Sequence, residues 1–425
     1  MEKDIQFKKN FIWNILGTGL NAFTSLFFMI TVTRINGVND AGIFTIAYAT
    51  ACIIYVIGIY AGRIYQVTEP DKNITNKEYI MNRLITTILM NILVLIFCFI
   101  RKYDFYKTTI FLLLTLYKSL EAFSEVIYGI LQKNEKLEIV GKSLFIKSII
   151  SVGVFIFIDM LMKNMILSIF SVIIVWIVMM LAFDFNKVHK YIDFSVPINW
   201  KNILNIFRLG FTTFAIAFLG LYILNAPKYA IDNYLENNVQ TVFGIIVMPA
   251  TVIGLVAQFL IHPYLNKILK LYEERNLKQL QKMLLKLIFS IVSIGIISSI
   301  LAFFVGTQVL GIIYGLDLSG YKIGLLTIII ASTLYTIGVI YSSVLTTVRE
   351  TFSQFIIYII ISIFALIISD IFTRMWNLDG AIWAYLFIML LQFLLYTVYT
   401  NIRLKMIFNR EKKSDEKNNF NSSSI

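Results

Sequence analysis

Residues Tyr117–Lys147 read YKSLEAFSEVIYGILQKNEKLEIVGKSLFIK, and this stretch places ionised side chains inside two apolar segments. Lys118, Glu121 and Glu125 interrupt the first segment at spacings of three and four, which puts them on one face of a helix. Lys147 interrupts the second segment. A charge at mid-bilayer costs roughly 2.5–3.5 kcal/mol on insertion scales, so such residues face a partner or a wet cavity. We therefore predict that this face lines a transport pathway.

The composition of the whole chain is that of a polytopic membrane protein. Of its 425 residues, 58% are hydrophobic and 15% are charged, whereas a soluble domain has about 45–50% apolar and about 25% charged residues. The net charge of +12 does not indicate a nucleic-acid partner, because the basic residues lie in short loops between apolar segments, where they suit anionic lipid headgroups. Cys52 and Cys98 are far apart, and neither histidine has neighbours at metal spacing. We expect no cofactor and no metal.

The apolar segments are long and lack the alternation of a barrel strand, so they predict an all-α protein with twelve transmembrane helices. Their distribution predicts two six-helix lobes around a central cavity: 1–183, a cytoplasmic linker 184–203, 204–402, and a disordered tail 403–425. The excess of Lys and Arg in alternate loops predicts that both termini are cytoplasmic. The predicted spans are 11–33, 41–62, 84–100, 108–131, 142–162, 164–183, 204–225, 239–264, 284–305, 321–346, 353–373 and 380–402.

The depths of the charged residues predict how they pair. Glu125 on the fourth span and Lys147 on the fifth lie at similar depth on adjacent antiparallel helices, so we expect these two side chains to pair. Lys118 and Glu121 are spaced to pair within their own helix. The alternative interpretation is that all these groups form closed, structural ion pairs that hold helices together.

Two other segments carry polar residues at helical spacing. Asn14 and Asn21 belong to a polar stripe on the first span, which is either a second wet face or a set of interhelical hydrogen bonds. Asn225, Lys228 and Asp232 lie at the outer end of the seventh span, where we expect Pro227 to end or bend the helix. These three residues form either a gate that contacts an anionic substrate or an ordinary polar helix end.

The same residues carry a resemblance to a known family. The run Tyr117–Ser148 resembles the fourth-to-fifth helix signature of Wzx-type polysaccharide-unit flippases of the MOP superfamily. RINGVNDAGIFTIAYA from Arg34, AGRIYQVTE from Ala61, NAPKYAIDNYLENNVQTVFGI from Asn225 and VLTTVRE from Val344 are also similar to segments of that family. The sequence departs from it at Lys118, Lys147 and Lys228, where arginine is common. Lysine keeps the charge but loses bidentate geometry toward phosphate.

The resemblance implies an undecaprenyl-pyrophosphate-linked oligosaccharide as the substrate, moved from the inner to the outer leaflet of a bacterial cytoplasmic membrane by alternating access. The product would be O-antigen, capsule or another surface polymer, and a polysaccharide polymerase and chain-length machinery are implied partners. Lys118 and Lys147 would then attract a pyrophosphate or an acidic sugar. Glu121 and Glu125 are the candidates for proton or sodium antiport, because a carboxylate inside a membrane protein can be protonated in one conformation and ionised in the other.

Two other functions compete with this interpretation. A multidrug or cation exporter of the same superfamily would need an acid-dominated cavity, whereas Lys118 and Lys147 favour an anionic substrate. A membrane-embedded glycan polymerase or ligase belongs to a different class and would usually have a sizeable external loop. The loops predicted here are short, and the chain has no phosphate-binding glycine loop, nucleophile elbow or HExxH motif. We therefore expect a transporter rather than an enzyme.

Overall fold

A computed structural model describes residues 2–60, 62–68, 74–193 and 195–422, and these residues form helices and short connections without any strand. The N-terminal helices are α1 (Glu2–Ile35), α2 (Val38–Ile59), α3 (Gly62–Thr68), α4 (Asn76–Arg101), α5 (Phe105–Lys133), α6 (Leu137–Met162), α7 (Met165–Met179) and α8 (Asn186–Val188). The others are α9 (Trp200–Tyr234), α10 (Asn237–Ile261), α11 (Leu265–Glu273), α12 (Leu277–Leu301), α13 (Thr307–Tyr314), α14 (Lys322–Thr347) and α15 (Thr351–Ser422).

The helices agree with twelve membrane crossings. Within the described residues, ten helical stretches are long and apolar enough to span a bilayer. α5 is not among them because of its interior charges, but with 29 residues it also has the length to cross. α15 is two helices joined at a kink, since Trp376 and Asn377 have non-helical backbone angles. Counting α5, and counting α15 twice, gives twelve, and the predicted all-α polytopic fold class is confirmed.

The apolar surface of the chain also fits a lipid environment. Large apolar side chains are exposed along α4 and at the start of α5, and Phe99 and Phe105 are 85% and 88% exposed. A soluble monomer rarely exposes contiguous apolar surface of this kind. In a bilayer these side chains contact acyl chains, and the helical backbone satisfies its own hydrogen bonds. The chain is therefore a multi-pass membrane protein.

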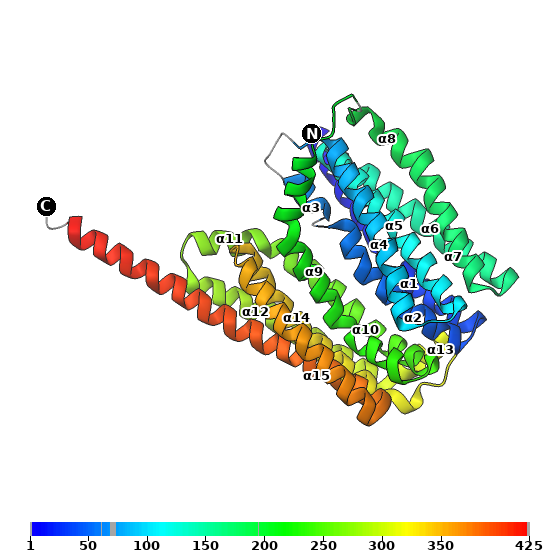
Figure 1. Cartoon of the computed structure of the whole chain (residues 1–425). Coiled ribbons are helices and arrows are strands. Elements are labelled where there is room, and N and C mark those ends of the chain that lie inside the picture. The colour runs from blue at the N-terminus through cyan, green and yellow to red at the C-terminus, as the bar shows by residue number, and fades with distance from the viewer. Residues whose placement is uncertain (1, 61, 69–73, 194, 423–425) are drawn as a thin grey trace. The chain divides into compact units, whose positions relative to one another are not determined.

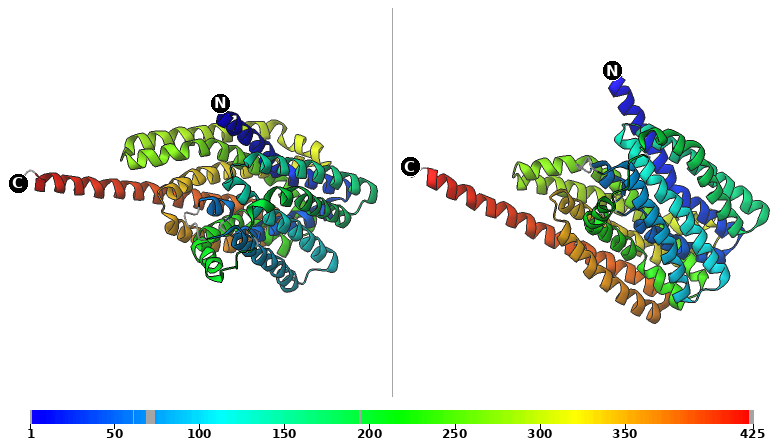
Figure 2. Two further views of the ribbon diagram at one scale, coloured as in Figure 1. Left: turned by 90° about the horizontal axis from the view of Figure 1, so that it is seen from above. Right: turned by 45° about the horizontal axis from the view of Figure 1, so that its top comes forward.

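The chain divides into two compact units. One consists of Met1–Asn225 with Leu235–Val242, and the other of Ala226–Tyr234 with Phe243–Ile425. The boundary between lobes at 184–203 stays a prediction from the sequence. In the second unit, α14 packs against α11, α12 and α15, and the C-terminal part of α15 extends well past the other helices of that unit (Figure 2).

α5 is the central helix of the first unit. It contacts α2, α3, α4, α6, α7 and α8, and more than half of its residues are buried (Figure 1). Its N-terminus is capped by Asp104, whose Oδ1 accepts a hydrogen bond from the backbone N–H of Lys107 at 2.8 Å. α1 packs closely on α6, because Gly17 and Gly141 meet and a Cβ on either would overlap backbone atoms of the other helix. Small residues at such a crossing let two membrane helices approach.

Two predicted helix ends differ from the structure. The sixth span does not end at residue 183, because a π-helical turn, Met180–Phe185, continues it into α8 and a 3₁₀ turn, His189–Tyr191. Pro227 does not end the seventh span, since α9 continues to Tyr234. A proline has no backbone N–H, so one carbonyl oxygen of the preceding turn loses its donor. In a membrane helix, neighbouring groups can hydrogen-bond to that oxygen, and the helix can continue.

α15 is helical to Ser422, through most of the segment 403–425 for which the sequence predicted disorder. The segment is rich in Lys, Arg and Glu, which are good helix formers. Extending an existing helix avoids the cost of nucleation, so such a segment adopts helical structure when it continues α15.

Candidate functional site

The predicted pair within α5 is present. Lys118 Nζ lies 2.6 Å from Glu121 Oε2, and the two side chains are 9% and 10% exposed. Both residues are on the same face of α5, as their spacing of three requires. The pair offsets two charges that would otherwise be costly in the low-dielectric interior. The prediction that Lys118 and Glu121 pair within their own helix is therefore confirmed.

Aromatic rings surround the ammonium group of Lys118. The Nζ atom lies 5.1 Å from the ring centroid of Tyr48, 5.6 Å from that of Tyr55 and 5.3 Å from that of Tyr117. A cation is attracted to the negative face of such rings within about 6 Å, and the attraction grows when water is excluded. Tyr48 and Tyr55 are seven residues apart on α2, which was the signal in the sequence that could have identified them.

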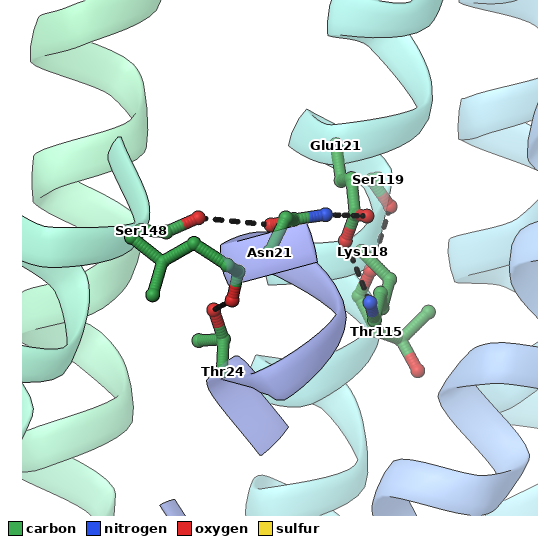
Figure 3. Close-up of polar contacts among 8 residues, drawn as sticks. Asn21, Thr24, Thr115, Lys118, Ser119, Glu121 and Ser148 are labelled. Carbon is green, nitrogen blue, oxygen red and sulfur yellow. Dashed lines mark hydrogen bonds and ion pairs between the residues drawn. The ribbon is translucent and has the colours of Figure 1, made fainter. Parts of the chain in front are cut away.

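Asn21 connects α1 to this pair. Its Nδ2 donates to Glu121 Oε1 at 3.1 Å, and its Oδ1 accepts from Ser148 Oγ of α6 at 3.4 Å (Figure 3). Glu121 thus uses one carboxylate oxygen for Lys118 and the other for Asn21. The polar stripe of the first span therefore reaches the charged face of α5 at Asn21.

Glu125 has a different partner from the one predicted. Its Oε2 lies 3.8 Å from Nε of Arg63 in α3, and both side chains are about one-fifth exposed. Nη1 of Arg63 is buried and has no hydrogen-bond partner among the described residues. The Arg63–Glu125 contact is long for an ion pair, and the guanidinium keeps at least one donor without an acceptor among the described residues.

Lys147 pairs with Asp184 instead of Glu125, so that prediction was wrong. Lys147 Nζ lies 2.5 Å from Asp184 Oδ2 and also donates to Ser124 Oγ at 3.1 Å and Tyr128 OH at 3.0 Å. Ser124 faces α6, and one residue further along a helix is a rotation of about 100°, which turns Glu125 toward α3. Asp184 was missed because the sequence placed it in a linker, whereas the π-helical turn Met180–Phe185 holds it inside the bundle.

The environment of Lys147 is closed. Lys147 and Asp184 are 0% exposed, and Ser143 Oγ donates to the second carboxylate oxygen of Asp184 at 2.6 Å. The ring of Trp176 lies 4.5 Å from Lys147 Nζ. In this conformation the pair holds α5, α6 and the end of the sixth span together, and it is not accessible to a ligand.

The other predicted site residues are Asn14, Asn225, Lys228 and Asp232. Asn14 Oδ1 on α1 is buried and has no hydrogen-bond partner within the described part of the chain, and Asn225 Nδ2 donates to the backbone oxygen of Leu221 at 2.9 Å. Lys228 and Asp232 lie further along α9, in the part that belongs to the second compact unit. Their proposed gating role stays a prediction.

Ala61 and Glu69, at the ends of the AGRIYQVTE segment, lie outside the described residues. Among the residues that are described, no group of three His, Cys, Asp or Glu side chains is arranged to hold a metal ion. The arrangement around α5 instead brings two cationic side chains, Lys118 and Arg63, next to two carboxylates, Glu121 and Glu125.

The closed pair Lys147–Asp184 should contribute to the stability of the fold. Lys147→Met leaves Asp184 charged and unpaired in the interior, so we expect it to lower the free energy of unfolding by about 3–5 kcal/mol. The double variant Lys147→Met, Asp184→Leu should recover most of that loss, whereas Lys147→Met combined with Glu125→Gln should not. Denaturant unfolding in detergent measures all three variants. Rescue by Glu125→Gln rather than by Asp184→Leu would contradict the pairing.

Comparisons with known proteins are consistent with this architecture. No family model matches the chain. The chain is 28% identical over 314 residues, which are 72% of its length, to the capsular polysaccharide biosynthesis protein CapF of Staphylococcus aureus, of which the match covers 77%.

Solved structures show the same fold at low sequence identity. An inward-facing multidrug-resistance MATE-family transporter of the MOP superfamily matches 93% of this chain and 99% of its own, with a TM-score of 0.69 and 14% identity. A MOP-superfamily transporter from Pyrococcus furiosus, described as having a binding pocket of reverse polarity, matches 94% of this chain and 95% of its own, with a TM-score of 0.57 and 15% identity. The chain therefore has the fold of MOP-superfamily transporters, and its similarity to CapF is consistent with the resemblance to Wzx-type members found in the sequence.

Proposed function

We propose that this protein is a flippase that moves an undecaprenyl-pyrophosphate-linked oligosaccharide from the inner to the outer leaflet of a bacterial cytoplasmic membrane. The observation that carries the proposal is the ion pair Lys118–Glu121 in the interior of α5, whose ammonium group lies within 6 Å of the ring centroids of Tyr48 and Tyr55. The relative named for capsular polysaccharide biosynthesis supports a saccharide substrate. In this proposal the N- and C-termini are both cytoplasmic, and a polysaccharide polymerase and chain-length machinery would use the product.

The chemistry of the α5 face suits an anionic amphiphile. A pyrophosphate can replace Glu121 at Lys118, and it can engage the unused donors of Arg63, because charge-assisted hydrogen bonds to phosphate are strong and short. Arg63 provides the planar donor geometry that Lys118 lacks. Tyrosine rings present flat apolar surfaces with a polar edge, on which a sugar ring can stack. Lys118 and Arg63 would therefore hold the charged group, and Tyr48 and Tyr55 would contact the sugar.

The same exchange can couple transport to an ion gradient. When a substrate anion takes Lys118, Glu121 loses its cationic partner and its carboxylate becomes available for a proton or a sodium ion. Glu125 would likewise lose its cationic partner if the substrate anion bound to Arg63. Binding of the substrate and binding of the cation are then linked through one set of partners, and linkage of this kind is reciprocal. Because substrate and cation favour each other's binding in this exchange, it couples their transport, whereas antiport would require the two to compete for the site.

The substrate site is tested by variants of Lys118 in proteoliposomes that contain a fluorescent undecaprenyl-pyrophosphate-linked oligosaccharide. Lys118→Gln should lower the rate of translocation at least about tenfold, because removing one charge-assisted contact costs roughly 1.5–3 kcal/mol. Lys118→Arg should keep most of the activity. The matched control is Lys278→Gln, which removes the same charge from an exposed position on α12.

Full translocation by Lys118→Gln would overturn the proposed substrate site. Export of cationic dyes by the wild-type protein, without movement of the lipid-linked sugar, would favour the multidrug exporter instead. The thermal unfolding midpoint of each variant in detergent separates a loss of function from a loss of folded protein.

Coupling is tested by replacing one carboxylate at a time. Glu121→Gln or Glu125→Gln should remove the stimulation of translocation by an imposed proton or sodium gradient, because glutamine neither ionises nor offers a charged ligand. Glu274→Gln, at an exposed position in the second unit, is the control for loss of one negative charge. If both α5 variants keep full transport under the gradient, these two residues do not couple it.

A further inference from the structure

A cavity of about 320 Å³ opens where the end of α5 and the start of α6 meet the segment Asn186–Tyr191. Its lining combines cationic, polar and apolar side chains from three parts of the chain. The lining residues are Leu131, Lys136, Glu138, Ile139, Asn186, Lys187, Lys190 and Tyr191, and we refer to this cavity as the basic pocket. Its volume falls within the range of small-molecule sites, about 300–1,000 Å³.

The lining of the basic pocket combines three lysines with apolar side chains. Lys136, Lys187 and Lys190 make no ion pair with a carboxylate among the described residues. Glu138 contacts Lys142, one turn further along α6, at 3.9 Å, so its charge is partly balanced outside the pocket. The lining also includes two apolar side chains, Leu131, which is fully buried, and Ile139, which is partly exposed. A site with several unpaired cations beside apolar surface suits an anionic group attached to a hydrocarbon chain.

The wall that carries Lys187 and Lys190 is fixed to the bundle. Asn76 Nδ2 donates to the backbone oxygen of Tyr191 at 2.8 Å, and Lys77 Nζ donates to the backbone oxygen of Val196 at 2.9 Å. Val188 and Ile192 are 0% and 7% exposed, so the backbone on both sides of Lys190 is anchored by buried side chains. The lysine backbones are therefore preorganised around the cavity, which lowers the entropic cost of binding.

We propose that the basic pocket binds the phosphate or pyrophosphate group of an anionic lipid at the membrane surface. The lysines lie where two apolar helices end, at the level of lipid headgroups, and they are unlike the Lys118 site, which lies within the bilayer. The phosphate can come from a phospholipid of the leaflet or from a prenyl pyrophosphate. Only the second source rests on the proposed function, where the pocket would receive the substrate before it reaches α5.

Binding is measured by calorimetry on the purified full-length protein in a zwitterionic detergent, with three water-soluble probes. These probes are farnesyl pyrophosphate, dihexanoyl phosphatidylglycerol and dihexanoyl phosphatidylcholine. The test variant combines Lys136→Gln, Lys187→Gln and Lys190→Gln. The matched control removes three charges from exposed positions in the second unit and combines Lys267→Gln, Lys278→Gln and Lys282→Gln.

We expect the pocket variant to bind farnesyl pyrophosphate at least tenfold more weakly than the wild type, and the control variant to bind it within about twofold. An equal loss for phosphatidylglycerol assigns the pocket to lipid phosphates in general, and a loss for farnesyl pyrophosphate alone assigns it to a pyrophosphate. The affinity for phosphatidylcholine should be the same for both variants and the wild type.

Equal affinities of the pocket and control variants for both anionic probes would overturn the proposal, because the lysines would then act only through net charge. Calorimetry measures binding without transport, so its result stands whether or not the translocation assay succeeds. A pocket that binds while Lys118→Gln leaves translocation unchanged would support this inference and contradict the α5 substrate site.

Discussion

The structure of the first unit depends on the need to balance charges inside a hydrocarbon environment. α5 carries a lysine and two glutamates in its interior, and none of them can face lipid without a large cost in solvation energy. The unit meets this constraint by enclosing α5 within six other helices and by giving each charge a partner from α5, α1 or α3. The position of α5 at the centre of the unit is therefore a consequence of its own sequence.

The ion pairs of this unit have different environments and, we infer, different roles. Lys147–Asp184 is fully enclosed and hydrogen-bonded on every side, so exchanging a partner would leave a bare charge in the interior. Lys118–Glu121 and Arg63–Glu125 keep some exposure, and Arg63 has a donor to spare. A closed pair stabilises a fixed arrangement of helices, whereas an accessible pair can exchange one partner for a ligand.

The sequence predicted those features that depend on local spacing or on length. Twelve crossings follow from the length of the apolar segments, and the pairing of Lys118 with Glu121 follows from their separation of three residues within one helix. The partner of Lys147 could not be predicted in the same way. It depends on how adjacent helices are rotated about their axes and on a π-helical turn at Asp184. Neither can be inferred from the depth at which a residue lies in its span.

The aromatic surroundings of Lys118 show the same limit. Tyr48 and Tyr55 recur at a helical period on α2, which the sequence displays, but their contact with a lysine on α5 arises from the packing of two helices. Buried tyrosines in a membrane helix are more often packing residues or interface anchors. Only the position of the Lys118 ammonium group distinguishes these two from the many others in the chain.

We infer that water reaches the face of α2 and α5 around Lys118, and the two native cysteines provide a direct test. Cys52 is partly exposed and lies one turn from Tyr48 on α2, whereas Cys98 is buried. In a Cys98→Ala background, a membrane-impermeant charged methanethiosulfonate reagent should modify Cys52, and the lipid-linked oligosaccharide should slow that reaction. The account is contradicted if Cys52 stays as unreactive as Cys98 does in a Cys52→Ala background.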